Sequence, residues 1–282
     1  MDDLRRRCVR SRLASLEMAC AAGSGHIAPD FSCMEILTAL FFRVLRVDPQ
    51  NPRLESRDRF ILSKGHAVGA LYVTLAAAGF FPEAWLQTYQ QYDSKLPGHP
   101  DRHRTPGVEH NSGALGHGLP VAVGLAAALR LLQPNPNTPR VFVLLGDGEL
   151  QEGSNWEAAM LAAQLKLSGL IAIVDRNGLQ QGAFTEQTVA LGDLAAKWAS
   201  FGWHVDVVDG HDLTALIDVL EAPPDAAGRP HAVIARTVKG KGAPFMENRP
   251  GWHHRVPDAA ERAQARAALE AELAVLGGAD HA

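Results

Sequence analysis

Apolar and polar residues follow two periodicities along the chain, one typical of amphipathic helices and one of buried strands. Continuous apolar runs, and segments rich in residues that favour strands, predict strands at residues 59–62, 141–145, 170–174, 203–208 and 232–237. Near-helical spacing predicts helices at residues 4–21, 34–45, 68–78, 83–92, 119–132, 154–167, 191–201, 213–221 and 259–276. Because strands and helices alternate, the order predicts an α/β fold: a doubly wound, mostly parallel sheet flanked by helices.

Local motifs refine this assignment at three places. Ser32 with Glu35, and Ser154 with Glu157, have the spacing of a capping box, in which both side chains bond to free N–H groups where a helix starts. Residues 95–115 instead form a long polar stretch with several prolines, glycines and histidines. A loop that long inside a compact domain usually carries function.

Composition and charge narrow the class of protein. Of the 282 residues, 46% are hydrophobic and 21% are charged, which is typical of a globular protein with a sizeable core and argues against disorder. The formal net charge is −4, so there is no basic excess to indicate nucleic acid as a partner. No internal repeat or clear boundary divides the chain. We therefore expect one domain over residues 1–282, ending in the helix at about 259–276.

The cysteines and the apolar stretches indicate a compartment. Cys8, Cys20 and Cys33 are odd in number and not paired in spacing, which favours free thiols in a reducing environment. The charged N-terminal segment lacks the apolar core of a secretory signal, and the most apolar stretch, residues 121–132, is too short to span a bilayer. These observations predict a cytoplasmic protein with no membrane partner.

Two acidic, glycine-containing turns follow the second and third predicted strands. Gly146, Asp147 and Gly148 come after one strand, and Asn177 follows the next. Ligands bind at the carboxyl ends of strands in open α/β sheets, so Asp147 and Asn177 are expected to converge. Their oxygens suit Mg²⁺ shared with phosphate groups, and the glycines allow a diphosphate to approach the backbone. Two ordinary glycine-rich turns are the alternative.

Histidines follow glycine more often than the 26 glycines would produce by chance. Five of the 12 do so: His26, His66, His99, His117 and His211. The first four fall in predicted loops of the first half, which favours a shared site over isolated surface residues. A zinc site is the alternative, because His is the commonest metal ligand, but no two of these four have i, i+4 spacing. Proton transfer and phosphate contacts are therefore favoured.

Two later motifs are weak when taken alone. The basic turn at residues 239–242, which alternates Lys and Gly, closes the last predicted strand and is most simply a solvated turn. Trp252, His253 and His254 follow in another polar loop.

Together these motifs resemble transketolase, a thiamine diphosphate enzyme family. They occur in the family's order: SGH from residue 24, LSKGHA from 62, LPGHP from 96, GVEHNSGALGHG from 107, GDGELQEG from 146, DRNG from 175, TVKGKG from 237 and WHHRVP from 252. The resemblance covers nearly the whole chain. It implies the thiamine diphosphate-binding fold and its diphosphate-binding domain.

The resemblance also implies a cofactor site. Asp147, Asn177 and the main-chain carbonyl of Leu179 would bind Mg²⁺, or Ca²⁺ or Mn²⁺ in its place. Thiamine diphosphate would contact Gly146 and His66 through its diphosphate and Gly113 and Leu115 through its rings, with Asp175 beneath the thiazolium.

The substrate side of the site is implied in the same way. His26, His66, His99 and one of His253 and His254 would face the hydroxyls of a sugar phosphate and help to move protons. We favour His254, because it precedes a Val-Pro pair that resembles the family's motif. Glu152 would belong to a carboxylate network at a subunit interface, and His117, which stands where the family often has Gln, is given no role.

The chain resembles only the first domain of a full transketolase, and therefore the N-terminal subunit of a split one. This implies a C-terminal partner subunit that carries the pyrimidine-binding domain, an α2β2 heterotetramer, and transfer of a two-carbon ketol unit between sugar phosphates. A 1-deoxyxylulose-phosphate-synthase-like or other thiamine-dependent two-carbon transferase is one alternative. A non-catalytic binding or regulatory subunit is another, and the intact Asp147 and Asn177 count against it.

Overall fold

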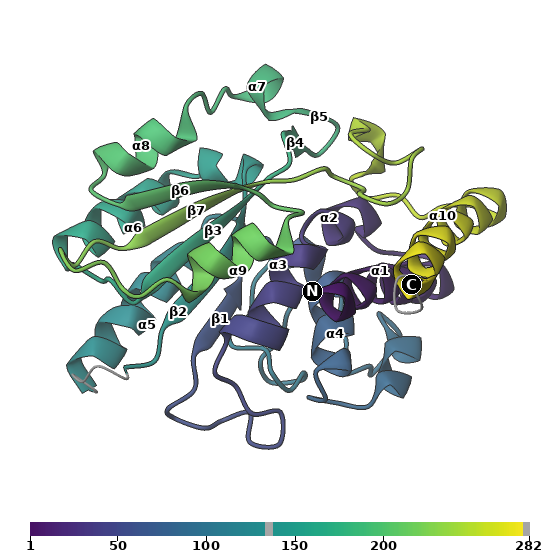
Figure 1. The fold of residues 1–282 in the computed structure, drawn as a ribbon, viewed down its shortest axis with the longest axis horizontal. Helices are drawn as coiled ribbons and strands as arrows, with labels where there is room; N and C mark the ends of the chain where they lie inside the picture. Colours follow the sequence, from purple (N-terminus) through teal and green to yellow (C-terminus); the bar gives the residue numbers. More distant parts are fainter. Residues whose placement is uncertain (133–137, 279–282) are drawn as a thin grey trace.

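A five-stranded parallel sheet forms the centre of the computed structural model, which describes residues 1–132 and 138–278 (Figure 1). Its strands are β1 (Arg59–Leu62), β2 (Val141–Gly146), β3 (Leu170–Arg176), β6 (His204–Asp209) and β7 (His231–Arg236). They lie in the order β1-β2-β3-β7-β6, and each neighbouring pair is parallel. The predicted doubly wound α/β sheet is thus confirmed.

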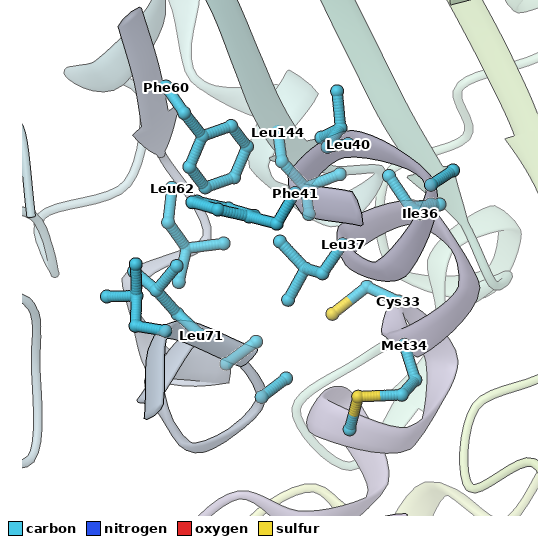
Figure 2. Packing of buried hydrophobic residues seen from close by; sticks show 14 of the residues in the cluster. Cys33, Met34, Ile36, Leu37, Leu40, Phe41, Phe60, Leu62, Leu71 and Leu144 are labelled. Carbon is cyan, nitrogen blue, oxygen red and sulfur yellow. The ribbon is translucent and has the colours of Figure 1, made fainter. Parts of the chain in front are cut away.

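Helices cover both faces of this sheet. One face packs against α1 (Asp2–Ala22), α3 (Met34–Ala39), α4 (Val68–Ala77) and α9 (Leu213–Glu221). The other packs against α5 (Gly118–Leu132), α6 (Gly153–Gln164) and α8 (Leu194–Ser200). Because side chains alternate along a strand, neighbouring residues enter different cores: Phe60 and Leu62 lie in the first, and Ile61 lies in the second. Figure 2 shows Phe60 and Leu62 against Leu37, Phe41 and Leu71.

A third cluster lies to one side of the sheet. The C-terminal helix α10 (Ala259–Gly278) packs on α1, and Ala265 and Leu269 are its buried side chains there. The short helix α2 (Ile27–Ser32), which the apolar pattern does not reveal, joins the same cluster. No helix in the described ranges is both long and apolar enough to cross a membrane.

Both predicted capping boxes are wrong, because the two serines bond to distant partners. Ser32 Oγ lies 2.5 Å from the Asp175 carboxylate, and α3 starts after Cys33 without a side-chain cap. Ser154 Oγ donates to the carbonyl of Gly116 at 2.7 Å, and α6 begins one residue earlier, at Gly153.

Other differences concern the ends of elements. The helix expected over 34–45 is α-helical only to Ala39 and continues as a π-helical turn, Leu40–Val44. Residues 83–92 form a 3₁₀ turn, Glu83–Thr88, in place of a longer helix. After β3 the chain adds elements that the sequence pattern does not predict: the hairpin of β4 (Leu179–Gln180) with β5 (Ala183–Phe184), and α7 (Thr185–Thr188).

Candidate active site

A cavity of about 230 Å³ lies at the carboxyl ends of β1, β2 and β3. Its lining combines residues that are far apart in the sequence: His26, Pro29, Lys64, His66, His99, Gly113, Leu115, Gly146, Asp147, Gly148, Glu149, Asn177, Leu179, Gln180, Gln181, Lys239 and His253. The strand-end turns and three of the Gly-His loops therefore meet in one place, as the strand order requires.

The two acidic turns are tied together by hydrogen bonds. Gly146 and Asp175 are partners in the β2–β3 register, which places the two turns side by side. The Asp147 carboxylate accepts hydrogen bonds from the backbone N–H of Gly148 at 2.8 Å and of Gly178 at 2.6 Å. Arg176 also donates to it, at 3.1 Å. The carboxylate is thereby fixed at the cavity wall.

Oxygen atoms suited to a hard cation gather at this wall. They are the Asp147 carboxylate, the side-chain oxygen of Asn177 and the carbonyl of Leu179. Asn177 Oδ1 accepts the N–H of Leu179 at 3.1 Å, which fixes the orientation of its amide. Burial and the nearby Asp175 carboxylate raise the pKa of Asp147. A bound cation would offset both effects.

A buried ion pair lies beneath the cavity. The ammonium of Lys64 contacts the Asp175 carboxylate, and both side chains are at most 1% exposed. Asp175 also accepts hydrogen bonds from Ser32, Thr237 and Asn177, the last at 3.2 Å. Burial opposes the charge of Asp175, but Lys64 and these donors hold the pKa of Asp175 below its usual value.

Glu149 joins the first acidic turn to the loop that carries Gly113 and Leu115. Its buried carboxylate accepts hydrogen bonds from Gly146 N–H at 3.0 Å, from Gly116 N–H at 2.9 Å and from Ser63 at 2.5 Å. Burial raises the pKa of this carboxyl group. Glu149 therefore positions two segments of the cavity wall.

Four histidine rings from three separate segments surround His26. The ring centroids of His66, His99, His253 and His254 lie 5.4, 6.4, 5.3 and 4.5 Å from that of His26. His253 lines the cavity, while His254, which the sequence favours, is exposed outside that lining.

Burial favours the neutral form of the His26, His66 and His253 rings. It lowers the pKa of His26 to about 4, aided by His254 and His99, and that of His253 to about 3, aided by the positive charge of Lys239. The pKa of His66 falls well below its usual value for the same reason. A neutral imidazole offers one donor and one acceptor, so the cluster can bind hydroxyl groups and pass protons.

Lys239 is a site residue that the sequence pattern does not identify. Its side chain is buried, not solvated, and its ammonium lies 2.8 Å from His253 Nδ1 and 3.5 Å from the Leu179 carbonyl. Among the residues that the structure describes, no carboxylate forms an ion pair with it. Burial and the neighbouring Lys64 lower the pKa of Lys239 to about 8.

Besides His254 and the buried Asp175, three further residues singled out by the sequence lie outside the cavity lining. His117 is exposed, and its ring contacts the carbonyl of Leu115 at 3.0 Å. The His211 ring forms hydrogen bonds with the Glu35 carboxylate and with the N–H of Val238, so it connects α3 to the segment after β7. Glu152 is exposed at the start of α6.

Comparison with known proteins identifies a family. Residues 5–274 match the family described as "Transketolase, thiamine diphosphate binding domain". The chain is 51% identical over 251 residues to an apulose-4-phosphate transketolase subunit of Actinobacillus succinogenes, and the match covers 89% of each chain. It is 40% identical over 252 residues to a 6-deoxy-6-sulfo-D-fructose transketolase subunit of a Clostridium species, with 89% of this chain and 90% of that one covered.

Solved structures give the same result. A transketolase from Pichia stipitis superposes with a TM-score of 0.87 at 30% identity, over 95% of this chain and 41% of that one. The chain thus spans about four-tenths of that full-length transketolase but nearly the whole of the two bacterial subunits. The comparisons confirm the resemblance seen in the motifs. This chain belongs to the transketolase family, as a thiamine diphosphate-binding subunit of the N-terminal, split type.

Proposed function

We propose that the chain binds thiamine diphosphate through a divalent cation and, with a partner subunit, transfers a two-carbon ketol unit between sugar phosphates. The observation that carries this proposal is the convergence of Asp147, Asn177 and the Leu179 carbonyl beside Gly146 and the buried Lys239. The oxygen atoms suit Mg²⁺, with Ca²⁺ or Mn²⁺ as substitutes, and the positive charge of the ammonium suits an anion.

The absence of a side chain at Gly146 leaves room in the cavity for a diphosphate. A Cβ atom added to Gly146 would meet no heavy atom closer than 3.7 Å, so the packing of the protein does not itself require glycine there. A side chain would instead project from the cavity lining, of which Gly146 is a part, near Lys64 and Glu149. Gly146 and His66 would contact the diphosphate, Gly113 and Leu115 would lie beside the rings, and Asp175 would lie beneath the thiazolium.

The chain's own residues would then orient the sugar and move its protons. When bound, the cofactor supplies an electron sink for cleavage of a ketose carbon–carbon bond. His26, His66, His99 and His253 would bind the substrate's hydroxyl groups, with His254 at the entrance. The neutral rings of His26, His66 and His253 would accept a proton from one hydroxyl and return it to another oxygen.

The substrates we propose are phosphorylated sugars. A relative with half of its aligned residues identical is named for apulose 4-phosphate, so we propose a ketose phosphate of that kind as a substrate. Residues 1–282 would act as one domain in a cytoplasmic α2β2 heterotetramer, whose other subunit carries the pyrimidine-binding domain. Glu152, exposed near the site, would face a neighbouring subunit.

Replacing Asp147 with Asn should weaken magnesium-dependent cofactor binding by more than about tenfold, or about 1.4 kcal/mol, because it removes the negative charge from the proposed cation ligands. Asn is preferable to Ala, since Asp147 is buried and accepts two backbone N–H groups. Calorimetric titration of the assembled enzyme measures the effect. Asp193→Asn, at the exposed cap of α8, is the matched control. Unchanged binding in Asp147→Asn would remove this residue from the metal site.

Replacing His26 or His99 with Ala should lower turnover by about 10²–10⁴-fold, the usual contribution of acid–base groups, with little change in cofactor affinity. His66→Ala should lower both, because His66 would also contact the diphosphate. Initial rates with ketose and aldose phosphates, together with cofactor titrations, separate these outcomes. His103→Ala, at an exposed histidine outside the cavity lining, is the control. Full ketol transfer by all three variants would show that the histidines are structural.

A further inference from the structure

A second cluster of metal-ligating side chains lies at the opposite end of the sheet. His204 and His231 are the first residues of β6 and β7, whereas the active-site cavity lies at the carboxyl ends of strands. The two histidines are partners in the parallel β6–β7 register. Asp206 is two residues along β6 from His204 and therefore projects from the same face of the sheet.

The three side chains already have the spacing of a coordination shell. Asp206 Oδ2 lies 3.2 Å from His204 Nε2 and 2.9 Å from His231 Nε2, and the three ligand atoms all lie within 4.8 Å of one another. Two ligands of a tetrahedral zinc ion, each bonded at about 2.0–2.1 Å, lie about 3.3 Å apart. Zinc could therefore take the place of the hydrogen bond between His231 and Asp206 and of the close contact between His204 and Asp206, with only small movements of the side chains.

The surroundings of the cluster leave room for an ion. A cavity of about 110 Å³ is lined by His204 and His231 together with Arg140 and Asp225, among other residues, while Asp206 lies outside this lining. The positive charge of Arg140 is directed elsewhere, since its guanidinium donates to the Leu220 carbonyl at 2.9 Å and lies over the Phe142 ring. The Asp225 carboxylate is paired with Arg229 at 2.7 Å, so the negative charge of the proposed site comes from Asp206.

Exposure also suits exchange of an ion with solvent. The side chains of His204 and Asp206 are 42% and 37% exposed, while that of His231 is 11% exposed. His231 Nε2 is hydrogen-bonded to the Asp206 carboxylate at 2.9 Å, so a zinc ion would take the place of the proton shared in that bond.

We propose that His204, Asp206 and His231 form a zinc site that joins strand β6, at the edge of the sheet, to β7 (Figure 1). Two imidazole nitrogens and one carboxylate oxygen suit Zn²⁺ better than Mg²⁺, which prefers oxygen ligands alone. Water would complete the shell. In the part of the chain that the structure describes, these three residues form the group of His, Cys, Asp or Glu side chains whose ligand atoms lie close enough together to share one ion. The proposal does not depend on the function proposed for the other site.

Zinc titration of the metal-stripped full chain tests this proposal. The titration is carried out in excess Mg²⁺, which competes at the oxygen-rich active-site wall but not for imidazole. His204→Gln and Asp206→Asn should each weaken one zinc-binding event by about tenfold or more, since loss of an outer-shell partner alone costs about 10–100-fold. His103→Gln, which removes an exposed histidine elsewhere, should leave zinc binding unchanged.

A second measurement keeps the test decisive if a variant fails to fold. Crystals of the unmodified chain grown with zinc chloride should show an anomalous scattering peak about 2.0–2.1 Å from the two Nε2 atoms. A peak confined to the histidines around His26, or zinc affinity that is equal in the variants and the control, would overturn the proposal. The cluster would then be a structural contact between β6 and β7, held by the hydrogen bond between His231 and Asp206.

Discussion

Ketol transfer by the purified chain alone should be at least about 10³-fold slower than by the chain with its partner subunit. A loss of this size lies within the range that removal of an acid–base group produces. The walls of the cavity carry Asp147 and Asn177, which we propose as metal ligands, together with Lys239 and four histidines. The family resemblance assigns the carboxyl group that activates the cofactor's pyrimidine ring to the other subunit. Without that subunit, water also reaches the reacting atoms.

The assay compares the chain alone, the partner alone and the two together, each with thiamine diphosphate, Mg²⁺ and both sugar phosphates. The assembled complex carrying Asp147→Asn is the control for activity that does not need the proposed metal site. Mass spectrometry of the lone chain checks for partner carried through purification. Full activity from a clean preparation of the lone chain would contradict the split-enzyme function.

Replacing Lys64 with Met should lower the free energy of unfolding by about 3–5 kcal/mol, the usual cost of removing one member of a buried ion pair. Met keeps the length of the side chain but leaves the Asp175 carboxylate buried with hydrogen bonds and no cation. Asp175→Asn, which leaves Lys64 buried and unpaired, should cost a similar amount. Urea unfolding monitored by circular dichroism measures both effects.

The double variant Lys64→Met/Asp175→Asn separates charge from packing. It should be less destabilised than the sum of the single variants, because no uncompensated charge remains. The folded-state pKa of Asp175 is lowered, so its contribution to stability is present above the unfolded pKa and is lost as the pH falls through the folded value. The double variant should therefore be less sensitive to acid. Strictly additive effects would mean that the pair contributes little as a pair.

The sequence predicts well those features that depend on local pattern. The buried strands β2 and β3 are visible as apolar runs, and the turns that follow them are visible as Asp147 and Asn177. Parallel pairing then brings the two turns together, because carboxyl ends of neighbouring strands share one edge. The Gly-His loops likewise predict three of the cavity's histidines: His26, His66 and His99.

The features that the sequence does not predict depend on distant partners. Lys64 is buried because it meets Asp175, 111 residues later, and an isolated lysine carries no sign of this. Ser32 leaves its expected capping role for the same carboxylate, 143 residues away. Lys239 lies in a motif that reads as a solvated turn, and only the tertiary fold places its ammonium in the cavity. The burial and partners of charged residues near Gly-rich turns therefore follow from the tertiary structure and not from the local sequence.

The position of α10 predicts where the native protein opens first. This helix lies beside α1 and away from the sheet (Figure 1), and its buried side chains are Ala265 and Leu269. Burying a leucine contributes about 1.5–3 kcal/mol, whereas ordering each residue of a helix costs about 1–2 kcal/mol of backbone entropy. The partly buried Leu273 and Leu276 and ion pairs from Arg262 and Arg266 to Glu17 add to this contact. Because α10 packs on α1 and lies away from the sheet, we expect its amide hydrogens to exchange with solvent through local detachment, earlier than those of β2 and β3.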